Sequence, residues 1–292
     1  MKQYKKITDP ESLWGDLFLP AKPKLNRGKG IRLVLFVSCN GGNNLLNALA
    51  LFEKKYPDQL NIIGVATDDS VNPNARITMK RRVWNEYTNE ERSELRSKVI
   101  NSCMNIGVPF YTGSVKTDYF RNIYKSWNPE VLFMLVFGQK LDSFLFDFPA
   151  MGAYNFHPSD LPKHIGIGPQ PFHEAIRKGL KTSVFTIHKI TELIDIGPIT
   201  GISTPINICL EDGTYPKSVL TMFEKITSVS TWMGIKLIAD IIARKASGQS
   251  GHVGWIDYSK ELPEEIKQLL LKPATDDRNE MYKVPDHPLL TK

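Results

Sequence analysis

The sequence predicts an α/β fold with a doubly wound, mostly parallel sheet and a C-terminal helical appendage. Apolar runs of strand length alternate with helical patterns from residue 31 to residue 137. The most apolar run, EVLFMLVF at 130–137, has no polar face, so helices must cover both sides of its strand. Buried strands separated by helices are typical of a doubly wound sheet.

The first half of the chain repeats a strand–helix unit. Residues 31–38 (IRLVLFVS) predict a strand, CNGGNN a tight Gly/Asn turn, and 45–56 a helix. Further strands are expected at 61–67, 108–111 and 130–137, and further helices at 88–107 and 118–127. Thr88 and Glu91 have the spacing of a capping box, and Gly107 is placed to end that helix.

The pattern changes after Gly152. We expect a short strand at AYNFH, a helix at 171–179 and strands at 183–190 and 198–206. From Tyr215 to Ala246 the apolar residues keep a 3.6-residue spacing, which predicts one long helix or a helix pair on the sheet. We therefore divide the chain into an arm at 1–29, a main domain at 30–210, and a C-terminal helix and tail at 211–292. The arm shows no periodicity, so ordered structure is expected to begin at Ile31.

Composition excludes several classes of protein. Among 292 residues, 41% are hydrophobic and 23% are charged, which excludes disorder, collagen and coiled coil for the whole chain. The net charge is +6, and residues 1–30, with seven basic and three acidic residues, hold +4 of it. The one internal basic cluster, Lys80, Arg81 and Arg82, favours a solvated surface over a nucleic-acid footprint. We do not expect a nucleic acid as partner.

Cysteine usage and hydropathy bear on location. The three cysteines are far apart and form no CxxC pair, which argues against a disulfide framework or a thiolate zinc site and favours a reducing compartment. The N-terminus has no apolar core of a signal peptide, and the longest apolar run, 131–137, is too short to span a bilayer. We expect a cytoplasmic protein that does not bind a membrane.

Two segments could carry chemistry. The first is CNGGN, between a strand and a helix, where free backbone N–H groups favour an anion such as phosphate. This segment lacks GxGxxG and a Walker lysine, so neither NAD nor ATP is indicated, and a plain tight turn explains it equally well. The second segment, 155–195, contains four of the six histidines.

Within 155–195, the spacings match no usual zinc motif, and Ser159 lacks the G-x-S-x-G of a hydrolase elbow. Asn155 and His157 are two apart on a strand, so their side chains point the same way and can share a pocket. They could donate hydrogen bonds to a developing oxyanion while Asp195 orients the imidazole. The alternative is an Asn that closes a turn and a His satisfied in the core.

The order of motifs resembles the folate-dependent formyltransferase family, which includes glycinamide ribonucleotide transformylase, methionyl-tRNA formyltransferase and the amino-sugar N-formyltransferases. The resemblance covers residues 31–206. It rests on NFHPS at Asn155–Ser159, Leu161–Pro162, Thr186–His188 and IDIGPI at Ile194–Ile199, with VFGQ at Val136–Gln139 and the phosphate loop at Ser38–Asn43. The fold implied is the Rossmann-like formyltransferase fold.

The resemblance implies roles for individual residues. Asn155, His157 and Asp195 would form the catalytic triad, with 10-formyltetrahydrofolate as co-substrate and no metal. The pterin would be held largely by backbone groups of Met134, Val136, Phe137, Gly138, Gln139, Thr191, Leu193 and Ile194. The acceptor would be bound by Asn40, Gly41, Gly42, Asn43 and Ser159.

The chain also departs from the family pattern, at Asp160 and at Ile165–Gly166. No acidic, His-containing helix occurs in 211–240, and residues 260–292 hold seven acids and six bases rather than a basic domain. We therefore expect the acceptor to be a primary amine on a small phosphorylated molecule, a nucleotide-linked amino sugar ahead of glycinamide ribonucleotide. A formyltetrahydrofolate hydrolase and a non-catalytic folate-binding protein are the alternatives. The oligomeric state stays open, with a homodimer among the options.

Overall fold

The computed structural model describes residues 4–25, 28–77, 83–276 and 282–291, so the cluster Lys80–Arg82 lies outside the described residues. Its main feature is a nine-stranded sheet with the order β1-β2-β5-β4-β3-β6-β7-β9-β10. The strands are β1 (Tyr4–Thr8), β2 (Gly15–Pro20), β3 (Ile31–Val37), β4 (Leu60–Thr67), β5 (Phe110–Gly113), β6 (Val131–Leu135), β7 (Ala153–His157), β9 (Thr186–Lys189) and β10 (Ile199–Ile202). The five central strands, from β5 to β7 in this order, pair in parallel, which confirms the predicted mostly parallel sheet.

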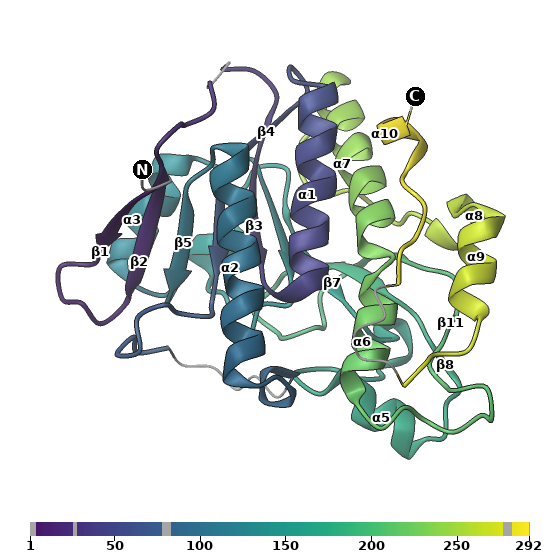
Figure 1. Cartoon of the computed structure of the whole chain (residues 1–292). Coiled ribbons are helices and arrows are strands. Elements are labelled where there is room, and N and C mark those ends of the chain that lie inside the picture. The colour runs from purple at the N-terminus through teal and green to yellow at the C-terminus, as the bar shows by residue number, and fades with distance from the viewer. Residues whose placement is uncertain (1–3, 26–27, 78–82, 277–281, 292) are drawn as a thin grey trace.

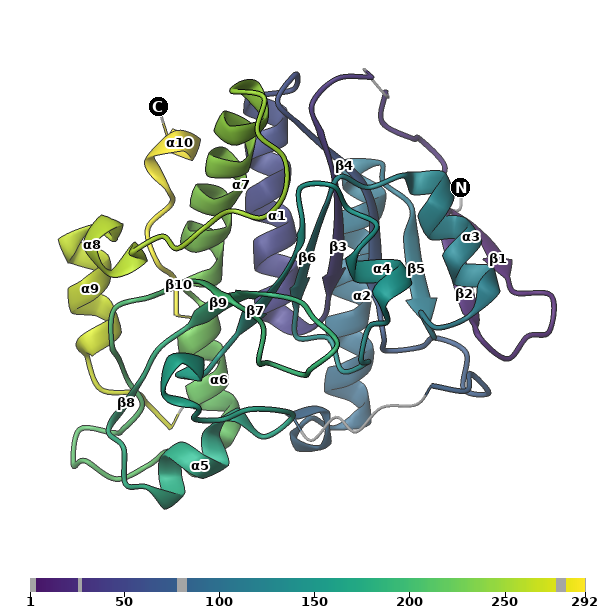
Figure 2. The same cartoon turned by 180° about the vertical axis from the view of Figure 1, so that it is seen from behind.

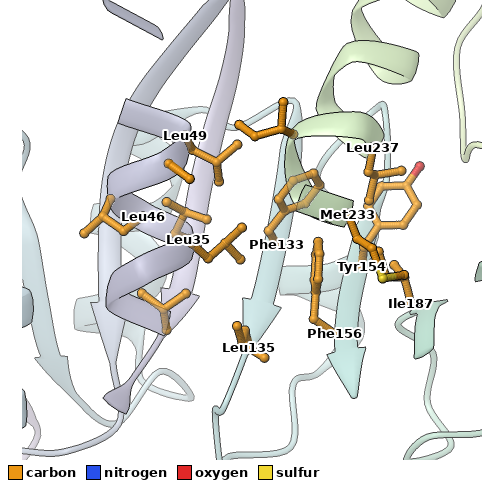
Figure 3. Close-up of a cluster of buried hydrophobic side chains, with 14 of the residues drawn as sticks. Leu35, Leu46, Leu49, Phe133, Leu135, Tyr154, Phe156, Ile187, Met233 and Leu237 are labelled. Carbon is orange, nitrogen blue, oxygen red and sulfur yellow. The ribbon is translucent and has the colours of Figure 1, made fainter. Parts of the chain in front are cut away.

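Helices cover both faces of the sheet (Figures 1 and 2). On one face lie α1 (Cys39–Lys55), α2 (Asn89–Ile106), α6 (Val219–Thr227) and α7 (Ser230–Ala246), and on the other lie α3 (Asp118–Trp127) and α4 (Ser143–Phe146). Each face has its own cluster of buried apolar side chains. Figure 3 shows part of the first cluster, where Phe133 and Phe156 of adjacent strands meet Met233 of α7. The fold is therefore doubly wound.

Local signals placed helix ends correctly. Thr88 accepts a hydrogen bond from the Glu91 N–H, and the Glu91 side chain accepts one from the Thr88 N–H, which completes the predicted capping box. Gly107 ends α2 in the left-handed conformation, with φ of 83°. These contacts are made within a few residues of each other, and for that reason the sequence alone reveals them.

The N-terminal segment is not a structureless arm. Strands β1 and β2 form an antiparallel hairpin, and β2 pairs with β5 at the edge of the parallel strands. Phe18 of β2 is buried and lies 6.0 Å from Phe110 between ring centroids. The Asp9 carboxylate accepts four backbone N–H groups, including those of Trp14 and Gly15, and so fixes the hairpin turn. The expectation that order begins at Ile31 is wrong, because a hairpin is specified by its pairing with β5 and not by a helical period.

The second half contains shorter elements than predicted. The expected strand at 183–190 is divided into β8 (Thr182–Ser183) and β9, and β8 pairs with β11 (Ile206–Asn207) in a separate two-stranded sheet. The short helices of this half are α5 (Pro171–Arg177), α8 (Tyr258–Glu261), α9 (Glu264–Leu271), α10 (Pro288–Thr291) and the 3-10 helix η2 (Leu161–Lys163), whereas the 3-10 helix η1 (Val83–Glu86) lies in the first half, before α2. Among them, α8 packs against β10, α9 against β11 and α10 against α1.

The stripe predicted at 215–246 is a pair of consecutive helices, α6 and α7, interrupted at 228–229. By length and composition Val219–Ala246 would suffice to cross a membrane, with a mean hydropathy of 1.4 in its most apolar window. However, 61% of that window is buried inside the protein, where α7 packs on α1. The apolar residues of this stripe are therefore part of the hydrophobic core.

Candidate active site

A cavity of about 830 Å³ opens at the carboxyl ends of β6 and β7. Ligands of α/β proteins bind at this edge of the sheet because the strand-to-helix loops converge there. Asn155 and His157 of β7 lie on its wall, and the loop after β9 supplies Asp195 from the facing side. The cavity therefore collects all three residues that the resemblance assigned to catalysis.

The three side chains lie within reach of one another. The Asn155 Nδ2 donates to Asp195 Oδ1 at 3.1 Å, and the His157 Nε2 lies 3.7 Å from Asp195 Oδ2. Asn155 and His157 are 7% and 8% exposed, so both are largely removed from water. The predicted juxtaposition of Asp195 with His157, across 38 residues of chain, is present.

Asp195 has an unusual backbone conformation and a shifted side-chain pKa. Its φ of 56° lies in the left-handed region, which non-glycine residues seldom adopt outside turns and functional sites. Burial by itself raises the pKa of Asp195, but the nearby His157 ring and the N–H of Gly168, 2.9 Å from Oδ2, act in the opposite direction. The pKa is therefore well below its ordinary value, and Asp195 carries its negative charge at neutral pH.

His188 is the residue that sequence reasoning left out of the site. It faces Asn155 across the β7–β9 pair, and its Nε2 lies 3.0 Å from Asn155 Nδ2 and 3.5 Å from Asp195 Oδ1. Its Nδ1 lies 2.9 Å from the backbone oxygen of Lys189. A carbonyl oxygen only accepts, so the network assigns the proton to Nδ1 and leaves Nε2 as an acceptor for the Asn155 amide. His188 belongs to the Thr186–His188 motif, but its pairing with Asn155 depends on the register of β9 on β7, which the sequence does not reveal.

The amide of Asn155 is consequently oriented. Both of its N–H groups have acceptors, His188 and Asp195, whereas no described residue hydrogen-bonds its Oδ1. His157 is oriented as well, since its Nε2 lies 2.8 Å from the backbone oxygen of Gly166. The expected direct donation from Asn155 to an oxyanion thus requires the amide to exchange one of its two present partners.

The residues expected to hold the pterin line this cavity. They are Met134, Val136, Phe137, Gly138, Gln139, Thr191, Leu193 and Ile194. Val136 has a φ of 57°, a costly conformation for a β-branched residue, and the next turn is fixed by the buried Asp68, which accepts the Gly138 N–H. The apolar side chains on this wall could cover a planar ring, and a cavity of this size takes a folate-sized ligand.

The proposed phosphate loop has a different structure from the one expected. Residues 39–44 form the first turns of α1, not a turn before it. A Cβ on Gly41 would lie 2.9 Å from Thr227 Oγ1, and one on Gly42 would lie 2.8 Å from Val37 Cβ, so the glycines allow close packing. The expectation of a tight turn is wrong, because the close approach of α1 to Thr227 is a tertiary contact.

Polar groups near the start of α1 are already engaged. The Asn40 Nδ2 lies 3.4 Å from Glu224 Oε1, and the Asn43 Oδ1 accepts a hydrogen bond from Ser102. Burial raises the pKa of Glu224, against the hydrogen bonds from Tyr87 and Asn40 that lower it. None of the four residues expected in the loop lies on the cavity wall that the described residues form.

Ser159 and the two departures from the family pattern are structural in this chain. The Ser159 Oγ donates to the Gly166 oxygen at 3.2 Å, and Ser159 is 1% exposed and off the cavity wall. Asp160 forms an ion pair with Lys163 at 2.7 Å, and Ile165 is buried in the apolar core. These residues support the β7–α5 loop, which carries Gly168 to Asp195.

Comparisons with known proteins agree with this architecture. The methionyl-tRNA formyltransferase of Kosmotoga olearia is 32% identical over 123 residues, which are 41% of this chain and 39% of that protein. The solved glycinamide ribonucleotide transformylase 1 of Symbiobacterium toebii is similar with a TM-score of 0.51 and 16% identity, covering 78% of this chain and 93% of that one. The phosphoribosylglycinamide formyltransferase of Anaplasma phagocytophilum gives a TM-score of 0.50 at 18% identity, over 73% and 88% of the two chains.

The structural similarity, at such low identity, concerns the fold. The match to the curated relative spans about two fifths of that relative's length. A profile of the family described as formyl transferase matches residues 33–215, more than half of the chain and all of the strands from β4 to β11. With this match and the shared sheet architecture, the chain belongs to the formyl transferase family.

Proposed function

We propose that the protein transfers a formyl group from 10-formyltetrahydrofolate to a primary amine. The observation that carries the proposal is the meeting of Asn155, His157 and Asp195 at one end of a cavity whose wall contains every residue expected to hold the pterin. The family assignment supports the same chemistry. When bound, the folate supplies the formyl group as an amide on its N10 nitrogen.

The side chains of this site can perform the two tasks that acyl transfer requires. Asp195, ionised and 3.7 Å from His157, stabilises the protonated imidazole, whose Nε2–H can exchange the Gly166 oxygen for the negative charge developing on the formyl oxygen. The Asn155 Oδ1 can accept an N–H of the acceptor amine, while its amide can exchange the Asp195 hydrogen bond for one to the oxyanion. His188 holds the amide in place during this exchange.

For the acceptor, we propose a nucleotide-linked amino sugar. The support is the sequence: the charge outside residues 1–30 is nearly balanced, and residues 260–292 carry no excess of basic groups. Binding a nucleic-acid backbone requires many cationic contacts. We also propose a cytoplasmic setting, in keeping with three free, buried cysteines.

The second candidate is formylation of methionyl-tRNA, which the similarity to methionyl-tRNA formyltransferases favours. The test is to incubate the purified protein with 10-formyltetrahydrofolate and, separately, nucleotide-linked amino sugars, glycinamide ribonucleotide, charged initiator tRNA and buffer alone. Released tetrahydrofolate and formylated product are both measured. We expect product with an amino sugar, and release without an amine would identify a hydrolase.

Robust, salt-sensitive formylation of the tRNA, with no reaction of the small amines, would refute the amino-sugar acceptor and favour methionyl-tRNA. Variants His157→Ala and Asn155→Ala should each lower turnover on the order of a hundredfold or more. Turnover near that of the wild type in both would refute the mechanism.

A further inference from the structure

The loop that follows β4, residues 68–77, reaches the active-site cavity at its far end. Its last residue, Ile77, is half-buried and lines the cavity. The beginning of the loop is held by the sheet and by α2: the Thr112 hydroxyl donates to the Asp69 backbone oxygen at 2.6 Å, and Arg96 pairs with the Asp69 carboxylate at 3.2 Å. The position of Ile77 therefore depends on what holds the rest of the loop.

The rest of the loop is held by the N-terminal hairpin. The Asn72 Nδ2 donates to the Ser12 oxygen at 2.8 Å, and the Arg76 N–H donates to the Leu13 oxygen at 2.6 Å. No other hydrogen bond between described residues connects the loop, from Asn72 onward, to another element. Because Arg76 directly precedes Ile77, the hairpin holds the chain one residue before it reaches the cavity.

The hairpin turn that supplies these two oxygens is itself fixed. Four of its backbone N–H groups donate to the Asp9 carboxylate, and the Ser12 N–H donates to the Asp9 backbone oxygen at 2.9 Å. The Trp14 oxygen accepts the Ser114 N–H at 2.8 Å, which fastens the turn to the end of β5. The turn is therefore a rigid support for the loop after β4.

This support is remote from the reacting groups. The matched family segment begins at residue 33, so β1 and β2 both precede it. In the sheet, β5, β4, β3 and β6 lie between β2 and β7, which carries Asn155 and His157 (Figure 2). A change where the loop meets the hairpin turn can therefore alter the cavity wall without a direct contact to either catalytic side chain.

We propose that Asn72 is a positioning residue of the active site, which fastens the loop to the hairpin turn and so keeps Ile77 on the cavity wall, in contact with the bound folate. The inference rests on the proposed use of a formyl folate as donor. A wall residue that is already in place spares the ligand the entropic cost of ordering it. If the loop is released, the complete wall exists for only part of the time, and the apparent affinity falls by that fraction.

The test compares two substitutions in the same loop. In Asn72→Asp the side chain keeps the oxygen that accepts the Asn74 N–H at 2.9 Å but loses the amide that donates to Ser12. Asn74→Asp is the matched control, because it adds the same charge at an exposed residue whose side chain makes no hydrogen bond to a described residue. For each protein, kcat and KM are measured with 10-formyltetrahydrofolate and with the amine acceptor, and the dissociation constant of tetrahydrofolate is measured by calorimetry.

We expect Asn72→Asp to raise the folate KM and the tetrahydrofolate dissociation constant by about threefold to tenfold, which is the scale of one hydrogen bond. Its kcat should stay within about twofold of the wild type, because Asn155, His157 and Asp195 keep their contacts. The control should behave like the wild type in all of these constants.

A double-mutant cycle tests whether Asn72 acts through Ile77. Ile77→Ala alone should raise the tetrahydrofolate dissociation constant, because the apolar contact is lost. Addition of Asn72→Asp to Ile77→Ala should raise it little further, since the side chain that Asn72 positions is already absent. Full additivity of the two effects would overturn the inference.

Other outcomes separate the possible failures. Unchanged folate constants in Asn72→Asp, an equal rise in Asn74→Asp, or a fall in kcat with an unchanged folate KM would overturn the positioning role and leave the proposed function standing. A rise confined to the KM of the amine acceptor would overturn the assignment of Ile77 to the folate. If tetrahydrofolate does not bind the wild type, the inference and the proposed donor both fail.

Discussion

Replacement of Asp195 by Asn tests the catalytic arrangement with little change of shape. Asparagine tolerates the left-handed backbone, here with φ of 56°, better than most residues, so the loop can keep its conformation. Its side-chain oxygen can still accept one of the two hydrogen bonds now made by Asn155 and Gly168. The main loss is the negative charge beside His157.

The size of the effect follows from the distance. Unit charges at 3.7 Å interact by about 4.5 kcal/mol at an effective dielectric constant of about 20, which is an upper limit here. Loss of most of this stabilisation of the protonated His157, about 3 to 4 kcal/mol, corresponds to a fall in kcat of about 10² to 10³-fold. The Asp195 side chain is 10% exposed, so solvent screening reduces the interaction only in part.

The assay measures kcat and KM for both substrates, with the folate dissociation constant as a separate readout. We expect kcat to fall while folate affinity changes little, because Asp195 acts on the reacting atoms. Asp212→Asn, an exposed carboxylate outside the cavity, controls for a general effect of charge removal. A folded Asp195→Asn protein with kcat within about threefold of the wild type would refute the electrostatic role.

Three further predictions concern stability and packing. Phe18→Ala should lower the free energy of unfolding by about 3 to 5 kcal/mol in urea titrations, because Phe18 joins the N-terminal hairpin to the core; a loss below about 1 kcal/mol would show that the hairpin is dispensable. Burial lowers the pKa of His252 and of His287 from 6.5 to about 4, so at mildly acidic pH these two residues bind protons in the unfolded chain and not in the folded chain. The stability that these two histidines contribute is complete above about pH 6.5 and should decline as the pH falls toward 4. Unfolding in this range should take up about two protons, and a variant with both histidines replaced by Gln should lose this uptake. If the free energy of unfolding of that variant kept the same slope against pH, the assignment would be contradicted. Gly42→Val should destabilise the fold through collision with Val37, and a selective rise in the acceptor KM of a fully stable variant would instead restore the phosphate role.

Much of the site was accessible from sequence because its residues occur in local patterns. Asn155 and His157 point the same way on any extended strand, whatever that strand pairs with. Asp195 was assigned through the family resemblance, by the IDIGPI motif that contains it, and the structure places it beside them. His188 was missed as a site residue because its place opposite Asn155 follows from the register of β9 on β7, which no local pattern encodes.

By itself, the sequence determined the features that arise from contacts between near neighbours along the chain. Hydrophobic period, the Thr88–Glu91 capping box and the left-handed Gly107 predicted the alternation of strands and helices and hence the doubly wound sheet. Only the tertiary structure decided the pairing of β2 with β5, the start of α1 at Cys39 and the hydrogen bond that the Gln139 side chain accepts from the Val115 N–H after β5. Each of these depends on partners distant in sequence, whose approach is governed by packing of the whole chain and leaves no periodic signal in either segment.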